Sequence, residues 1–408
     1  MHCKVIHVQI HSFSGGKAAR RLHKSFLEEG VDSQVLSLVG DLDDDACMMN
    51  SGKKAWIKAR IDYKIESCIL RNTIKDLGKF SFPVLGTDIS KFESVYKADI
   101  IYLNWVLGGF MNLQGYRNLA KTGKPVVIVM HDMWTITGGC HHSFSCDKYT
   151  SECFKCPMFN GRNLFDLAAR GYRKKLKLYT EFENLYFVSP SKWLHDCAKK
   201  SSLTRHKPVF HIPNIVDESV FKPLNKEAAR QFLNINSEEY VIAFGALSLS
   251  NPYKGWKELE KALDILSKGK YHRNLSVLIF GGGYNQKLAN SIRLKTIFLG
   301  YLKDEYSMAL AYNAADVFVV PSKADNLPTT ILECLSCGTP VTGFDVGGIP
   351  EMIDHMNNGY LASGNDPEDL AKGIEFCLAN KLRGRLLPDF HKDVILKKHM
   401  DLLNNISK

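Results

Sequence analysis

The sequence contains no apolar run that approaches the ~20 consecutive residues needed by a membrane-spanning helix. Its first residues, MHCKVIHVQI, lead directly into a strand pattern and lack the features of a signal peptide. We therefore expect a cytoplasmic protein, either free or bound peripherally to the inner face of the plasma membrane.

Other absences exclude further classes of protein. There is no short-period repeat and no low-complexity segment, which argues against a solenoid or a disordered chain. The eleven cysteines are irregularly spaced in a long chain, so they do not indicate a secreted disulfide framework. Basic residues are dispersed and form no aromatic-basic reading motif, so no nucleic-acid partner is expected.

What is present is typical of a globular protein with two domains. The chain has 408 residues, a hydrophobic fraction of 45% and a charged fraction of 24%. Its net charge of +10 suits an anionic partner such as a nucleotide or an anionic membrane. The same charge also fits an ordinary, mildly basic protein.

Strands and helices alternate through both halves of the chain, which predicts an α/β protein with parallel sheets. A first strand near Val5–Ile10 is followed by a turn with Gly15 and Gly16, then by a helix over Lys17–Glu29. A phosphate can approach the backbone at such a glycine turn, although a plain turn is the alternative. The second half repeats this pattern from a strand at Val241–Phe244.

The most informative stretch runs from Asp316 to Glu351 and reads as strand, loop, helix, strand and loop. We expect the helix to begin near Ile331, capped by Thr329 or Thr330. Free backbone N–H groups at a helix start attract phosphate. Asp325 in the loop and Glu333 in the helix could accept hydrogen bonds from ribose or sugar hydroxyls.

This stretch resembles the donor-binding core of the family 4 glycosyltransferases, which are retaining enzymes of the GT-B type. The matching positions are Pro321, Ser322, Asp325, Glu333, Cys337, Gly338, Pro340, Val341, Gly347, Gly348, Pro350 and Glu351. The resemblance implies two facing Rossmann-like domains with an interdomain cleft. Asp325 stands where the family usually has glutamate, which shortens the reach to the donor sugar.

The resemblance also implies a site for a nucleotide sugar, UDP- or GDP-linked, held mainly by the second domain. Lys254 would neutralise the donor diphosphate, and Glu333 would bind the ribose. Asp325, with the backbone of Asn326 and Leu327, would face the sugar and the phosphates.

In the first domain, Gly15 and Gly16 would face the diphosphate, and His131 would orient the transferred sugar. The residues implied as catalytic are therefore His131, Asp325 and Lys254. No nucleophile and no obligatory catalytic metal are expected. Ala246 and Asn104 depart from the family pattern, since relatives often carry arginine and histidine at those two positions.

Four cysteines lie close together in the loop 138–157: Cys140, Cys146, Cys153 and Cys156. Four thiolates could hold a structural zinc in tetrahedral geometry. Reduced thiols that bind nothing and an iron–sulfur cluster are the alternatives. The surrounding HDMW…TGGCH…CxxCP pattern resembles glycosyltransferases of exopolysaccharide and capsule assembly, including the colanic-acid type. Cys334 and Cys337 lie within the predicted helix and are expected to pack.

The segment Lys53–Lys75 is basic and has apolar residues at helical spacing. Its apolar face could lie on an anionic membrane. The favoured alternative is a surface helix that packs this face against its own domain.

We expect an N-terminal acceptor-side domain over 1–212, a donor domain over 213–388, and a C-terminal helix over 389–408 that returns to the first domain. The predicted activity is transfer of a hexosyl group from a nucleotide sugar to a glycan acceptor. We expect this acceptor to be lipid-linked and to take part in surface polysaccharide assembly. Two alternatives remain: a nucleotide-binding protein without turnover, and a nucleotide-sugar epimerase or hydrolase of the same fold.

Overall fold

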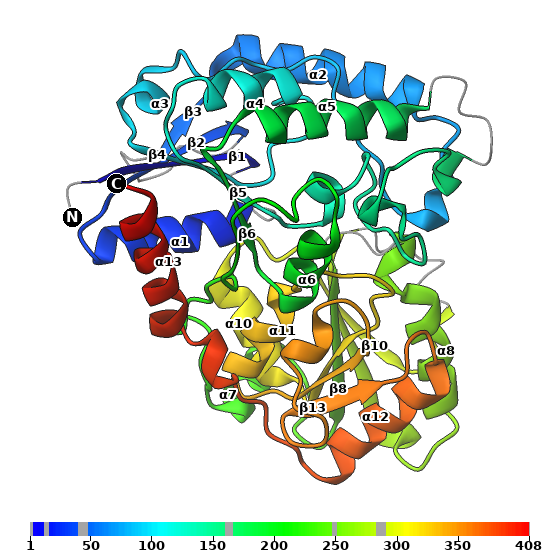
Figure 1. Cartoon of the computed structure of the whole chain (residues 1–408). Coiled ribbons are helices and arrows are strands. Elements are labelled where there is room, and N and C mark those ends of the chain that lie inside the picture. Colours follow the sequence, from blue (N-terminus) through cyan, green and yellow to red (C-terminus); the bar gives the residue numbers. More distant parts are fainter. Residues whose placement is uncertain are drawn as a thin grey trace. The chain divides into compact units, whose positions relative to one another are not determined.

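The computed structural model describes residues 3–11, 16–39, 48–159, 166–246, 251–282 and 291–407 (Figure 1). The chain divides into two compact units: unit 1 is Met1–Ile215 with Ile395–Lys408, and unit 2 is Val216–Val394. Unit 1 extends to Ile215 because Ile212 and Ile215 pack with the C-terminal helix in one hydrophobic cluster. The division predicted from the sequence is after residues 212 and 388.

Unit 1 contains a seven-stranded parallel sheet in the order β3-β2-β1-β4-β5-β6-β7. The strands are β1 Lys4–His11, β2 Asp32–Val39, β3 Met48–Asn50, β4 Ile100–Leu103, β5 Val126–Val129, β6 Leu185–Ser189 and β7 Val209–His211. The central strands are buried on both faces, as their near-continuous apolar sequences require.

Helices cover both faces of this sheet. They are α1 Lys17–Glu28, α2 Gly52–Ile69, α3 Glu93–Lys97, α4 Leu113–Ala120, α5 Leu167–Glu181, α6 Lys192–Lys200 and α13 Lys392–Ile406. Residues of α1 and α13 pack with one face, while α2, α4, α5 and α6 contribute to the cluster on the other. The C-terminal helix predicted over 389–408 begins at Lys392, because Pro388–Phe390 form a separate 3-10 turn.

Unit 2 contains a six-stranded parallel sheet in the order β10-β9-β8-β11-β12-β13. The strands are β8 Tyr240–Ala246, β9 Leu275–Gly281, β10 Lys295–Gly300, β11 Val317–Val320, β12 Val341–Phe344 and β13 Gly359–Ala362. The helices are α7 Lys226–Phe232, α8 Trp256–Leu266, α10 Glu305–Ala314, α11 Thr329–Ser336 and α12 Pro367–Ala379. α7, α10 and α11 pack on one face, and α8 and α12 pack on the other.

Each sheet has one point where the chain reverses its direction of winding. In unit 1 this point lies between β1 and β4, and in unit 2 between β8 and β11. Loops that leave the carboxyl ends of strands on either side of such a point diverge and leave room for a ligand. The predicted α/β fold with two Rossmann-like domains is confirmed, and each domain presents one such position.

The predicted basic helix forms as α2, but its orientation differs from the favoured expectation. Its buried residues are Ala55, Ala59, Asp62 and Glu66, whereas most of its large apolar side chains are exposed. The alanines allow a close approach, since a Cβ on Gly109 would lie 2.3 Å from the Ala59 carbonyl oxygen. The expectation that the apolar face packs inward is therefore wrong. Within the described residues, no helix is both long and apolar enough to span a bilayer.

Candidate functional site

Three loops meet at the carboxyl ends of β8, β11 and β12 in unit 2. Two glycines in the left-handed region make this meeting possible. A Cβ on Gly255 (φ +72°) would lie 1.7 Å from the Pro321 carbonyl oxygen, and one on Gly347 (φ +58°) would lie 1.9 Å from that of Asp325. Only glycine can accept both the backbone conformation and the close approach.

Lys254 and Asp325 come together from two of these loops. The Lys254 ammonium lies 2.6 Å from the Asp325 carboxylate, and the side chains are 32% and 16% exposed. Burial alone would lower the pKa of Lys254, but the Asp325 carboxylate raises it above its ordinary value. The lysine is therefore a permanent cation at the edge of the sheet.

Glu333 lies in α11 with only 1% of its surface exposed, and Tyr312 donates a hydrogen bond of 3.1 Å to its carboxylate. α11 begins at Thr329, and its capping position is Pro328, which offers no side-chain acceptor. The predicted capping by Thr329 or Thr330 is therefore wrong. The helix begins with backbone N–H groups that no capping side chain satisfies, as an anion-binding helix start requires.

Asn326 and Leu327 are almost completely buried, at 3% and 6% exposure. Leu327 packs in the hydrophobic core of unit 2. Their backbone, rather than their side chains, is thus the part that lies beside Asp325 at the sheet edge. The structure brings Lys254, Asp325 and the start of α11 to one place.

The corresponding edge of unit 1 lies at the ends of β1, β4 and β5. Gly16 immediately precedes α1, and a Cβ there would lie 1.8 Å from the His11 carbonyl oxygen, so the turn requires glycine. Gly15 lies outside the described residues. His131 follows β5, and burial lowers its pKa, which keeps the imidazole neutral near pH 7.

Strand alternation adds two polar residues to this edge. His7, Tyr102 and Val129 point to the same face of the sheet, toward α1 and α13. Gln9 lies two positions after His7 in β1 and therefore shares that face, while Asn104 and His131 follow the ends of β4 and β5. The Asn104 N–H donates to Val8 O at 2.9 Å, which places Asn104 beside Gln9.

Gln9 and Asn104 are buried, at 1% and 8% exposure. Among the described residues, both polar atoms of the Gln9 amide and the Asn104 amide nitrogen lack a hydrogen-bond partner. Buried amides are normally paired, so these groups at the sheet edge are candidates for contacts with a ligand. Sequence reasoning missed Gln9, although a glutamine in the apolar strand VIHVQIH was a usable signal.

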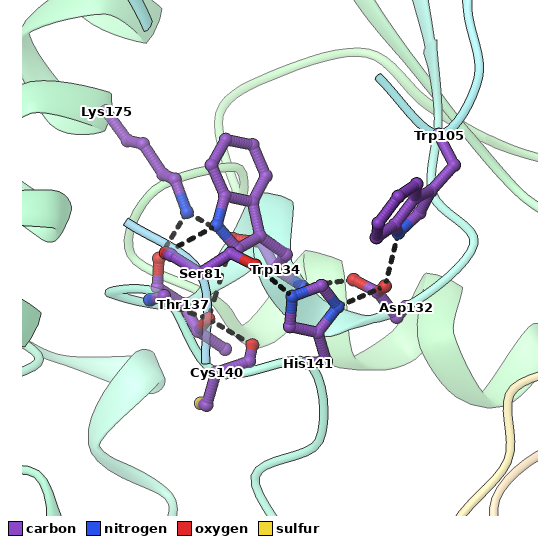
Figure 2. A network of polar contacts seen from close by, with 9 residues as sticks. Ser81, Trp105, Asp132, Trp134, Thr137, Cys140, His141 and Lys175 are labelled. Atoms are coloured by element: carbon purple, nitrogen blue, oxygen red, sulfur yellow. Dashed lines mark hydrogen bonds and ion pairs between the residues drawn. The ribbon is translucent and has the colours of Figure 1, made fainter. Parts of the chain in front are cut away.

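Asp132, which follows His131, organises the loop after β5. Figure 2 shows its carboxylate between Trp105 and His141. It accepts hydrogen bonds from His141 Nδ1 at 2.6 Å, the Trp134 backbone N–H at 2.8 Å and Trp105 Nε1 at 3.3 Å. Burial alone would raise the Asp132 pKa, but His141 and these donors lower it strongly, so the carboxylate stays ionised.

The network continues from His141 to Ser81 and from Trp134 to Lys175 (Figure 2). His141 Nε2 lies 2.9 Å from Ser81 Oγ. The Lys175 ammonium lies 3.6 Å from the centre of the Trp134 ring and donates to the carbonyl oxygens of Trp134 and Thr137. Side chains from three separate segments thus hold the residues that follow His131.

The predicted zinc site is not supported. Among the described residues, which include all four cysteines, no group of three or more His, Cys, Asp or Glu side chains could hold a metal ion. Burial raises the pKa of Cys140 to about 12 and that of Cys153 to about 11, and neighbouring cysteines of the loop add to the rise in both cases. The Cys153 sulfur accepts a hydrogen bond from the Gly138 N–H. Cys334 and Cys337 are buried in the core, as expected.

Residues 238–380 match a family model described as "Glycosyl transferases group 1". The chain is 23% identical over 173 residues to an uncharacterized glycosyltransferase of Haemophilus influenzae, covering 42% of this chain and 46% of that protein. It is 30% identical over 179 residues to a D-inositol 3-phosphate glycosyltransferase of Mycobacteroides abscessus, covering 41% and 39%. The matched region spans less than half the length of these curated relatives.

Solved structures resemble the whole chain. A sucrose-phosphate synthase from Thermosynechococcus elongatus superposes with a TM-score of 0.69 at 17% identity, over 99% of both chains. Anabaena HepE in complex with UDP-glucose superposes with a TM-score of 0.65 at 15% identity, over 99% of this chain and 100% of that one. At such low identity these likenesses establish the fold, which is of the GT-B type.

Proposed function

We propose that the protein is a glycosyltransferase that takes a sugar from a nucleotide-sugar donor. The observation that carries this proposal is the group formed by Lys254, Asp325 and the start of α11 at the switch point of unit 2. This group lies within the region that matches the glycosyltransferase family model. The complex of Anabaena HepE with UDP-glucose supports a donor of this chemical class.

In the proposed donor site, Lys254 and the first N–H groups of α11 bind the diphosphate. Breaking the bond between sugar and diphosphate leaves negative charge on the leaving phosphate, and fixed positive charge there lowers the barrier. Asp325 holds Lys254 in place and, with the Asn326 and Leu327 backbone, faces the sugar. Glu333 accepts hydrogen bonds from ribose hydroxyls.

Unit 1 supplies His131 to the transferred sugar. Because its lowered pKa keeps the ring neutral, His131 hydrogen-bonds a sugar hydroxyl rather than adding positive charge. Gly16 gives a phosphate close access to the backbone at the start of α1. We further propose that transfer retains the anomeric configuration and that the acceptor is a lipid-linked glycan of surface polysaccharide assembly.

The donor site is tested by thermal melting with UDP, GDP, ADP and their sugar conjugates. A ligand at about 100 times its dissociation constant adds about 2.7 kcal/mol to the free energy of unfolding. We expect a shift with one diphosphate that is lost in Glu333→Gln, which preserves the volume and the Tyr312 contact. Glu368→Gln, at an exposed position of α12, is the matched control and should keep the shift. No shift with any nucleotide would contradict the proposed donor site.

Turnover is tested separately by measuring release of the nucleoside diphosphate with and without a membrane extract that contains acceptor lipids. Transfer predicts release that depends on the extract, and NMR of the product reports the anomeric configuration. Release without an acceptor would favour a hydrolase or an epimerase. Binding without release from any donor would favour a nucleotide-binding protein.

A further inference from the structure

A cavity of about 340 Å³ lies in unit 1 beside α4 and α5, and it shares no residue with the proposed donor site of unit 2. Its lining comes from the segment 81–84, from the start of α4 at 112–114 and from α5. Trp134 and Gly138 of the loop after β5 complete the lining. A cavity of this volume accommodates a small organic molecule.

Positive charge dominates the lining of this cavity. Four basic side chains and no Asp or Glu contribute to it: Arg117, Lys174, Lys175 and Lys177. Arg117 pairs at 2.6 Å with Glu181, which lies outside the lining. Within the part of the chain that the structure describes, neither Lys174 nor Lys177 forms an ion pair with a carboxylate. Charge of one sign in a cavity attracts and concentrates ligands of the opposite sign.

The wall formed by residues 82–84 is apolar and is held in place without a ligand. Phe82, Pro83 and Val84 line the cavity. Glu66 accepts a hydrogen bond from the Phe82 N–H at 2.5 Å, and Asp62 accepts one from the Val84 N–H at 3.0 Å. A preformed wall lowers the ordering cost of binding, and its apolar side chains suit the organic part of a ligand rather than a bare ion.

Lys175 connects the cavity to the loop after β5. It is 1% exposed, and its ammonium donates to the carbonyl oxygens of Trp134 and Thr137. Burial lowers the Lys175 pKa to about 7, although three neighbouring groups raise it: Cys153, Cys140 and Asp132. An anion in the cavity favours the protonated ammonium, so its binding should be accompanied by proton uptake.

We propose that this cavity binds a small phosphorylated organic molecule. A phosphate monoester carries roughly −1.5 to −2 charges at pH 7 and three acceptor oxygens, which matches a lining with several cations and no carboxylate. Its phosphate lies among Lys174, Lys175 and Lys177. Its organic part lies against Phe82 and Val84. The inference does not rest on the proposed glycosyl transfer, because it uses no residue of the donor site.

The test is calorimetric titration of the full-length protein with phenyl phosphate, which combines a phosphate monoester with an apolar ring. Phenol, which lacks the phosphate, should not bind. Lys174→Gln with Lys177→Gln should lower the affinity for phenyl phosphate at least about tenfold. Lys199→Gln with Lys200→Gln, at exposed positions of α6 in the same unit, is the matched control and should bind like the wild type. Melting of each variant excludes unfolding as the cause of lost binding.

A second comparison separates this cavity from the proposed donor site. Lys254→Met should keep the affinity for phenyl phosphate, and the variant with Lys174→Gln and Lys177→Gln should keep the affinity for the donor nucleotide. Loss of phenyl phosphate binding in Lys254→Met alone would place the ligand in the donor site and overturn the proposal. Failure of the donor site itself would leave the binding of phenyl phosphate intact.

Proton uptake tests the contact with Lys175. At pH 8 a phosphate monoester is fully ionised, since its second pKa is about 6. Titrations in two buffers of different ionisation enthalpy should therefore show proton uptake by the wild type and none by Lys175→Met.

Competition identifies the source of the phosphate. Glycerol 3-phosphate should displace phenyl phosphate from the wild type. Displacement by vesicles of phosphatidic acid, without displacement by glycerol 3-phosphate, would assign the phosphate to a lipid and overturn a small-molecule ligand. No binding of phenyl phosphate, or equal affinity in the Lys174→Gln, Lys177→Gln variant and its control, would also overturn the proposal.

Discussion

The carboxyl edges of the two sheets have the same topology but opposite polar chemistry. In unit 2, charged groups meet and satisfy one another: Lys254 pairs with Asp325, and Tyr312 donates to Glu333. In unit 1, the polar groups of Gln9 and Asn104 are neutral and, among the described residues, unpartnered. A doubly negative diphosphate needs the first kind of edge, and neutral sugar hydroxyls need the second. The difference accords with the proposal that the donor nucleotide binds to unit 2 and that unit 1 contributes contacts to the transferred sugar.

Lys254 of unit 2 and Lys175 of unit 1 show a similar contrast between the two units. Lys254 faces a carboxylate, which raises its pKa. Lys175 is buried against carbonyl oxygens and the Trp134 ring, and burial lowers its pKa to about 7. The first is therefore a fixed charge available to a ligand, and the second is a structural group whose charge depends on pH.

The largest effect is expected from Lys254→Met. It removes the cation proposed for the diphosphate and leaves Asp325 without its partner, so nucleotide affinity should fall about 100-fold or more, equal to about 2.7 kcal/mol. Calorimetric titration measures this. Lys323→Met is the matched control, since Lys323 pairs with Glu258 at 2.7 Å and is 33% exposed. An equal loss in both variants would remove the special role of Lys254.

The next effect is expected from Asp132→Asn, which acts on unit 1. It removes the negative charge that accepts hydrogen bonds from His141 and the Trp134 backbone N–H. The free energy of unfolding should therefore fall by about 1.5–3 kcal/mol. Transfer, measured as kcat/KM, should fall about tenfold because His131 is no longer held in place. Nucleotide affinity should be unchanged. If Asp132→Asn lost nucleotide binding without losing stability, the proposed separation of nucleotide binding in unit 2 from sugar contact in unit 1 would be contradicted.

Lys175→Met tests the pH-dependent group. Between pH of about 7 and the ordinary value of 10.5, the unfolded chain keeps a proton on Lys175 that the folded chain releases. The wild-type free energy of unfolding should therefore rise with pH across this range, by up to about 1.4 kcal/mol per pH unit, and this gain is absent at lower pH. Denaturant unfolding at pH 7, 8 and 9 should show a flatter dependence in the variant. Parallel slopes would show that Lys175 keeps its proton.

The smallest effect is expected from Asn104→Leu. Because an unpaired buried amide is unfavourable, its removal should stabilise the fold by about 1 kcal/mol. The same change should lower kcat/KM for sugar transfer while nucleotide affinity stays constant. Greater stability with unaltered transfer would show that Asn104 contacts no substrate. Ser276→Ala, another buried polar group without a partner among the described residues, is the control, since it lies on β9 away from both edges.

Much of the fold could be predicted from the sequence, because alternating strands and helices with glycine turns leave few arrangements for a parallel sheet. The strand before Pro321 and the helix that holds Glu333 were located within a few residues. The pairing of Lys254 with Asp325 could not be predicted from the sequence, since it depends on how two distant loops approach each other. Gly255 and Gly347 permit that approach, but their spacing does not reveal it.

The wrong orientation predicted for α2 has a physical cause. The orientation of α2 was predicted from its apolar residues, whereas the backbone N–H groups of Phe82, Val84 and Leu85 need acceptors and draw Asp62 and Glu66 inward. Backbone groups that need hydrogen-bond partners thus decided the orientation of α2, and a hydrophobic pattern does not report them. The zinc site predicted from the cysteine spacing is not supported among the described residues.

The most direct test titrates UDP, GDP and ADP into wild type, Glu333→Gln and Asn104→Leu by calorimetry, and measures transfer in the same three proteins. We predict that one nucleotide binds wild type and Asn104→Leu equally, that Glu333→Gln loses this binding, and that transfer is lost in Glu333→Gln and lowered in Asn104→Leu. Loss of nucleotide binding in Asn104→Leu, or wild-type binding in Glu333→Gln, would contradict the assignment of the donor to unit 2.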